Sequence, residues 1–120
     1  MTPISRLVAV SVYAVLVVAS SPVALSQAAQ GSSDERQEFS SLLAKAEKGD
    51  ADAQYRLGVM YFNGEGVPKN DAEAYFWWNL AAAQGNENAK TNRDIVEKKM
   101  TREQIAEAQR RSAAWKPKKE

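Results

Sequence analysis

The segment 64–70, GEGVPKN, holds residues that could do chemistry, because glycines next to a lysine can cradle a phosphate group. A phosphate-binding P-loop has the pattern G-x-x-x-x-G-K-[ST] directly after a strand. Here the spacing of the glycines differs, Lys69 is followed by Asn70, and no strand pattern precedes the loop. We therefore expect these glycines to shape a turn and not to hold an anion.

Side chains that usually perform catalysis are scarce in this chain. The 120 residues include no His and no Cys, which removes the Ser–His pair, the thiol nucleophile and the usual zinc ligands. Carboxylate pairs such as Asp50 and Asp52 lie at a predicted helix start, where the helix dipole stabilises them. A glycosidase-type pair would also need a substrate cleft. We predict that the protein is not an enzyme and that it binds no cofactor and no metal.

Aromatic side chains are the better candidates for recognition, since Trp and Tyr dominate interface hot spots. Trp77 and Trp78 are adjacent, which leaves two interpretations open. In the first, one indole faces the core of a helical hairpin and the other packs on an adjoining unit. In the second, one indole lines a groove for a peptide or a partner helix. The candidate partner-binding residues are Tyr55, Phe62, Tyr75 and Trp78.

Residues 1–28 have the layout of a secretory signal peptide. Arg6 precedes an apolar run over 7–19, which is too short to cross a hydrocarbon core of about 30 Å, and small residues follow Pro22. An uncleaved membrane anchor is the alternative, whereas the absence of Cys excludes a lipoprotein anchor. We expect an exported, periplasmic protein that meets the membrane only through this segment; secretion, or retention at the inner membrane by an uncleaved signal, stays open.

The rest of the chain is predicted to be helical, because no stretch alternates polar and apolar residues over strand length. Gly49, Gly64 and Gly85 each end a helical block, and Asp50 follows the first of them at a typical N-cap position. The predicted organisation is a flexible lead-in at 29–37, a helical domain at 38–116 and a tail at 117–120. Without disulfides, a domain of this size has only a marginal core.

Charge is divided unevenly between the two halves of the exported part. Residues 30–89 carry 5 basic and 10 acidic side chains, whereas residues 90–120 carry 10 basic and 5 acidic ones. This division suggests complementarity within one chain or between chains, or simply solvated faces. The basic residues near the C-terminus suggest an anionic envelope polymer or an acidic partner, and not a nucleic acid. A solvated, frayed terminus is the competing interpretation. These residues are Arg110, Arg111, Lys116, Lys118 and Lys119, around Trp115.

The pattern L-G-x-x-Y-x-x-G-x-G-V at 57–67, followed by A-x-x-W-x-x-x-A-A-x-x-G at 74–85, resembles the Sel1-like repeat. This family is a branch of the tetratricopeptide-type α/α solenoids. The resemblance implies an all-α fold, a short α/α helical-hairpin repeat solenoid, with one full repeat at about 49–85 and polar C-terminal capping helices at 86–116. It also implies protein–protein interaction. The matching residues are Ala53, Leu57, Gly58, Tyr61, Gly64, Gly66, Val67, Ala74, Trp77, Ala81, Ala82 and Gly85.

The chain departs from the repeat pattern on both sides of this unit. Downstream, Arg93, Asp94 and Glu97 replace the Leu, Gly and Tyr of the pattern. About one and a half units is fewer than the three or so that repeat proteins usually need. Either the terminal helices substitute for missing repeats, or the protein associates with itself or with a partner. We expect a non-catalytic adaptor of the bacterial envelope, or alternatively a structural envelope protein that binds anionic polymer through its basic C-terminal helix.

Overall fold

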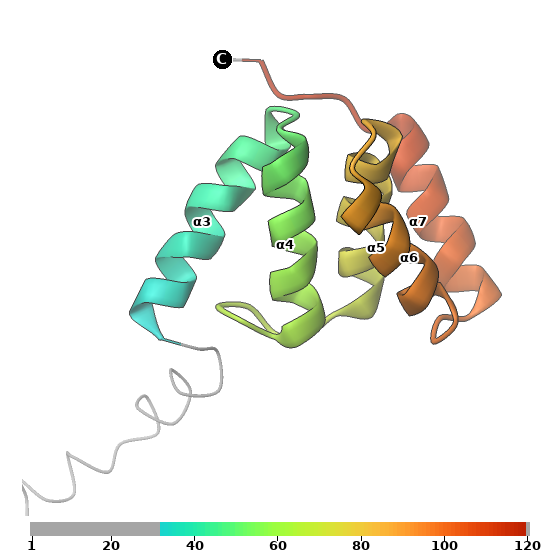
Figure 1. The fold of residues 1–120 in the computed structure, drawn as a ribbon, viewed down its shortest axis with the longest axis horizontal. Helices are drawn as coiled ribbons and strands as arrows, with labels where there is room; N and C mark the ends of the chain where they lie inside the picture. Colours follow the sequence, from blue (N-terminus) through green and yellow to red (C-terminus); the bar gives the residue numbers. More distant parts are fainter. Residues whose placement is uncertain (1–31, 120) are drawn as a thin grey trace, which may run out of the picture.

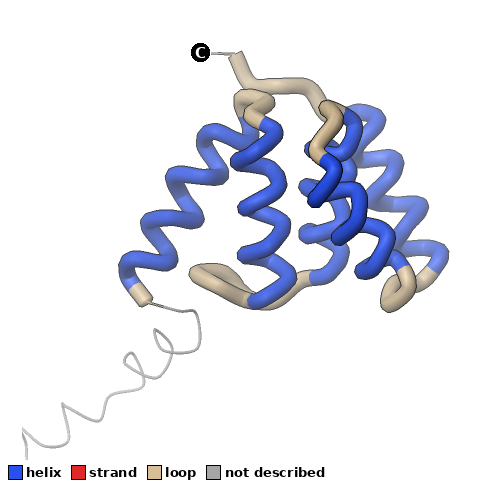
Figure 2. Tube along the Cα trace, viewed as in Figure 1, coloured by secondary structure: helices blue, strands red, loops and turns tan. Residues whose placement is uncertain are grey.

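The computed structural model describes residues 32–119. This part of the chain is entirely helical, with short loops between the helices and no strand (Figure 2). The all-α fold predicted from the sequence is therefore confirmed for these residues. The predicted signal peptide, 1–28, lies outside the described residues. The five helices are α3 (Ser33–Glu47), α4 (Ala51–Asn63), α5 (Asp71–Ala83), α6 (Glu87–Glu97) and α7 (Arg102–Ala114).

Consecutive helices run antiparallel, so that α4 and α6 point in the same direction with α5 between them (Figure 1). Helix α5 is the centre of the arrangement, because it packs against α4, α6 and α7. More than half of its residues are buried, including both tryptophans. Helix α3 packs on α4 and closes one end of the stack, and α7 closes the other. This is the short solenoid of helical hairpins that the repeat pattern implied.

Helix α3 begins earlier than predicted. Residues 33–37, expected in a flexible lead-in, form its first turns. A capping box explains the start, because the Glu35 backbone N–H donates to Ser32 Oγ at 3.1 Å and the Glu35 carboxylate accepts from the Ser32 N–H at 3.4 Å. The prediction was wrong here because the S-x-x-E signal lies in a segment of otherwise polar composition.

The loop 64–70 is the turn between the two antiparallel helices of the repeat, as predicted. Gly64 and Gly66 have φ angles of 74° and 72°, which side chains with a Cβ rarely adopt. A Cβ on Gly66 would lie 2.5 Å from the carbonyl oxygen of Glu35, so the loop rests directly on the backbone of α3. Lys69 donates to the Phe62 carbonyl at 2.8 Å and to Asp71 at 2.7 Å. This lysine therefore stabilises the turn.

Two hydrophobic clusters hold the helices together, and the tryptophan pair divides between them. Trp77 belongs to the cluster formed by α3, α4 and α5, whereas Trp78 belongs to the one that reaches α6 and α7. They are 5% and 2% exposed. The first interpretation of the pair predicted this division. The buried indole N–H of Trp77 has no hydrogen-bond partner among residues 32–119, and nothing in the structure accounts for it.

The two ends of the helical stack are polar. The exposed positions of α3 include Ser33, Gln37 and Ser40, and those of α7 include Glu103 and Glu107. Terminal helices with polar outer faces are what a repeat stack needs in water. Within the described residues, α3 and α7 therefore substitute for missing repeats.

After α7 the chain turns back across the end of the stack toward the α3–α4 turn (Figure 1). Residues 115–119 form this C-terminal strap. Trp115 packs against the first cluster, the Lys118 N–H donates to the Glu47 carbonyl at 2.7 Å, and the Lys118 ammonium lies 2.9 Å from the Glu47 carboxylate. The Glu47 carbonyl is among those at the end of α3 that have no partner within the helix. The C-terminus is therefore tied to α3 and not frayed, whereas Lys116, Lys118 and Lys119 are exposed to solvent as expected.

We predict that Trp115→Ala lowers the free energy of unfolding by about 1–2 kcal/mol, because it removes apolar contact that ties the strap to the core. Urea unfolding followed by circular dichroism measures this change. Lys119→Ala, at an exposed position of the same strap, is the control and should change stability by less than about 0.5 kcal/mol. Equal free energies of unfolding for the two variants would mean that the packing of Trp115 does not stabilise the fold.

Candidate functional site

An apolar groove of about 310 Å³ lies between α4 and α6. Its volume falls at the lower end of the range of about 300–1,000 Å³ that is typical of ligand pockets. The α4 side chains recur at spacings of three and four residues, so they project from one face of that helix. The lining residues are Tyr55, Val59, Phe62 and Asn63 of α4, Trp78 of α5, and Asn92 and Ile95 of α6.

Trp78 forms the floor of this groove. Its indole N–H donates to the Tyr55 carbonyl at 3.0 Å, and its ring lies 5.7 Å from that of Phe62, centroid to centroid. Gly58 makes this contact possible, because a Cβ there would lie 2.3 Å from the indole nitrogen. Helices α4 and α5 therefore cross closely at Gly58. Trp78 supports the groove from below and exposes almost no surface of its own.

The rim of the groove holds Ile95, which is 51% exposed. It is the one large hydrophobic residue of the described chain with an exposed side chain. Val96, the next residue along α6, is fully buried. Successive residues of an α-helix point about 100° apart, and on α6, which packs mainly against α5, Val96 faces the core and Ile95 does not. Ile95 therefore presents an apolar side chain to solvent beside the groove.

The structure brings together three of the four candidate partner-binding residues. Tyr55 and Phe62 are half-buried walls of the groove, and Trp78 is its floor. Tyr75 does not belong to the groove: it is 2% exposed, lies in the second cluster, and its hydroxyl accepts from Gln109 of α7 at 3.3 Å. Tyr75 is thus directed toward α7, whereas Trp78, one turn further along α5, is directed toward α4.

Sequence reasoning missed four groove residues, which are Val59 and Asn63 of α4 and Asn92 and Ile95 of α6. The α6 segment departs from the repeat pattern and gave no motif to follow. A usable signal was present nevertheless: Ile95 and Val96 are adjacent apolar residues in a helix whose other positions are mostly polar. Such a pair indicates that one side chain faces away from the core.

One end of the groove is basic. No charged residue lines the groove itself. Where α4 and α6 end, the ammonium groups of Lys69 and Lys99 lie 4.4 and 5.3 Å from the centroid of the Phe62 ring. Contacts at these distances are cation–π interactions. The site is thus an apolar surface with a positive margin, which is formed by Lys69 and Lys99.

The opposite charges of the two halves meet within one chain at two places. Arg111 of α7 lies 2.5 Å from the Glu73 carboxylate of α5 and 4.2 Å from the centroid of the Phe76 ring, and Lys118 pairs with Glu47. Burial, and then the charge of Glu73, raise the pKa of the nearby Tyr61 hydroxyl, whereas Arg111 lowers it. These groups join helices and do not form a cleft. Part of the predicted complementarity is therefore intramolecular.

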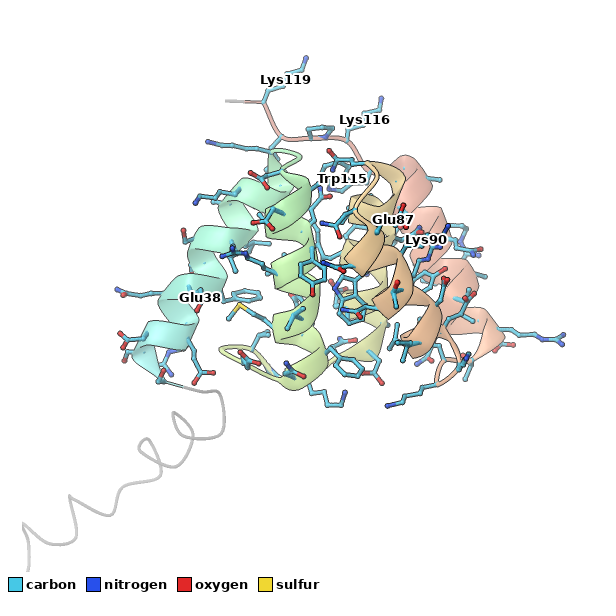
Figure 3. The ribbon with its side chains drawn as sticks, in the orientation of Figure 1. Glu38, Glu87, Lys90, Trp115, Lys116 and Lys119 are labelled. Carbon is cyan, nitrogen blue, oxygen red and sulfur yellow. The ribbon has the colours of Figure 1, made fainter. Side chains whose placement is uncertain are left out.

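These ion pairs also reduce the basic surface available at the C-terminus. Arg110 pairs with Glu107, and Arg111 and Lys118 are occupied as described. Lys116 and Lys119 point away from the helices (Figure 3). Of the strap lysines, these two alone have no ion pair among residues 32–119. The C-terminal region therefore offers fewer basic side chains for polymer binding than predicted, because the predicted set included Lys118, which pairs with Glu47.

In residues 32–119 no group of three or more Asp, Glu, His or Cys side chains is arranged to hold a metal ion. Within the same range, every helix is too short or too polar to cross a lipid bilayer.

Antiparallel helical hairpins stacked around a groove define a short α/α repeat protein. Residues 51–86, which comprise α4, the 64–70 loop and α5, match the family model of the Sel1 repeat. The chain therefore contains a Sel1 repeat. The matched residues agree with the repeat expected at about 49–85. Sel1 repeats generally mediate protein–protein interaction.

Proposed function

We propose that this protein is a non-catalytic adaptor of the bacterial cell envelope that holds a protein partner in the α4–α6 groove. The observation that carries the proposal is the groove itself, an apolar surface with the exposed Ile95 on its rim. Exposed apolar surface costs free energy in water and marks interaction sites when it is contiguous. The general role of Sel1 repeats supports a protein as the partner.

The envelope location is supported by the sequence of residues 1–28, which has the charge, apolar run and small residues of a signal peptide. Export into the periplasm is the location that this layout favours.

The test is capture of the partner by two variants that each add one negative charge. Ile95→Glu places the charge on the groove rim, and Ala44→Glu places it at an exposed position of α3, which takes no part in the groove. The tagged full-length chain is produced in its source bacterium, cross-linked mildly and purified from envelope extracts. We expect one stoichiometric partner with the wild type and with Ala44→Glu, and its loss with Ile95→Glu.

Both variants should keep the wild-type helicity, because both positions are exposed. Undiminished capture by Ile95→Glu would contradict the groove as the binding surface. Recovery of cell-wall glycan that depends on Lys116 and Lys119 and is lost at high salt would favour polymer binding instead. Recovery of the chain only from the cytoplasmic fraction would contradict the envelope location.

A further inference from the structure

We infer that the groove recognises a peptide segment in which apolar side chains are followed by a carboxylate, and that Lys99 binds this carboxylate. The inference rests on the proposed function, since it names the chemistry of the partner for the same groove. It follows from the distribution of apolar, amide and charged groups along α4 and α6.

The walls of the groove select apolar side chains. Val59, Phe62 and Ile95 contribute aliphatic and aromatic surface, with the Trp78 indole beneath them. Because no charged group lies on these walls, a charged side chain buried there would lose its hydration without gaining a partner. The small volume of the groove admits the side chains of one short segment.

A free amide is available for the backbone of such a segment. The Asn63 amide already donates to Glu65 at 2.8 Å. The Asn92 side chain, by contrast, makes no hydrogen bond within the described residues although it lines the groove. A side-chain amide has both a donor and an acceptor, so Asn92 can satisfy the N–H and the C=O of a bound backbone.

The positive margin decides the charge of the segment. Lys69 is already bonded to Asp71 and to the Phe62 carbonyl. Lys99 lies over the Phe62 ring and has no carboxylate partner among residues 32–119. It lies in the turn directly after α6, which ends at Glu97, and its contact with the Phe62 ring places its ammonium group at that end of the groove. An acidic residue that follows the apolar side chains thus meets an unpaired ammonium group, whereas a basic residue meets two like charges.

The other end of the groove offers no comparable charge. At the start of α4, Asp52 and Arg56 pair with each other at 3.1 Å and are mutually neutralised. The asymmetry gives the bound segment a direction, with its carboxylate at the end where α4 and α6 terminate.

Selection from a library of random short peptides tests the inference with the full-length protein. Peptides are recovered on the wild type and on Ile95→Glu, and those that the variant no longer binds are groove ligands. We expect these ligands to combine apolar residues with Asp or Glu at one end. The same selection on Lys99→Glu should recover Lys or Arg in place of the acidic residue.

Fluorescence anisotropy with one selected peptide then measures the contribution of Lys99. Lys99→Gln should weaken binding of the acidic peptide about two- to fivefold, in keeping with a partly exposed ion pair, and the effect should diminish at high salt. Lys98→Gln removes the neighbouring charge and is the matched control, for which we expect no loss. A counterpart peptide with Gln in place of its acidic residue should bind the wild type and Lys99→Gln equally.

The possible outcomes separate the two claims. Groove ligands without an acidic bias, or an acidic bias that survives Lys99→Glu, would overturn the inference while the groove remains a binding site. If no peptide depends on Ile95, the inference and the proposed function both fail. Dimerisation of the wild type that Ile95→Glu abolishes would also overturn the inference, because the occupant of the groove would then be a second copy.

Discussion

Trp78→Ala is expected to lower the free energy of unfolding by about 3–5 kcal/mol, the usual cost of removing a buried tryptophan. The indole is 2% exposed, contacts the Phe62 ring and donates to the Tyr55 carbonyl across the α4–α5 interface. Removing it leaves a cavity at the place where the two helices of the repeat meet. Urea unfolding, followed by circular dichroism at equilibrium, measures the loss.

Ile95→Ala is the control for this change, since it also removes an apolar groove residue but from an exposed position. It should alter stability by less than about 0.5 kcal/mol. A loss below about 1 kcal/mol for Trp78→Ala would contradict the structural role of the indole. The comparison also determines which variant can be used in a binding test. Loss of the partner in a Trp78 variant would be explained by unfolding, whereas loss in an Ile95 variant would show that the partner binds at the groove.

Gly58→Ala is expected to destabilise the protein by about 1–3 kcal/mol, as overpacking of a tight core does. Alanine has the higher intrinsic helix propensity by about 1 kcal/mol, so propensity alone predicts the opposite sign. The steric term prevails because the new Cβ would lie within 2.3–2.8 Å of three atoms of the buried Trp78 ring. The indole would have to shift and would lose its bond to the Tyr55 carbonyl.

A double-mutant cycle isolates this steric term. In a Trp78→Leu background the indole atoms are absent, so Gly58→Ala should cost much less than in the wild type or should stabilise the chain. The difference between the two backgrounds measures the coupling of the two positions. If Gly58→Ala stabilises the wild type, then Gly58 is not required for the close approach of α4 and α5.

The sequence allowed most of the helix boundaries to be predicted, because caps are local signals. Asp50, which was predicted as an N-cap, accepts a hydrogen bond from the Ala53 N–H, and Asn70 and Thr101 cap α5 and α7 in the same way. The repeat motif predicted the α4–α5 hairpin correctly for the same reason, because its residues lie close together in the sequence. Residues such as Leu57 and Ala81 are fully buried at the helix crossings that the motif encodes.

Contacts between distant segments were not predictable in the same way. The strap depends on Lys118 meeting Glu47, which is far from it in the sequence, and no local pattern indicates such a pair. The groove was predicted only in part, since its α4 wall belongs to the repeat motif and its α6 wall does not. The direction in which Ile95 faces depends on how α6 packs on α5, and this is a property of the tertiary structure.

We propose that the α4–α6 groove is the surface that holds the partner. Site-specific photo-cross-linking in living cells tests it most directly. A photoreactive amino acid replaces Ile95 on the groove rim, Ala44 on α3 or Lys119 on the strap, one at a time, in the full-length chain. We predict a cross-linked partner from position 95 and none from positions 44 and 119. A partner cross-linked from position 119 or 44, and not from 95, would contradict the claim.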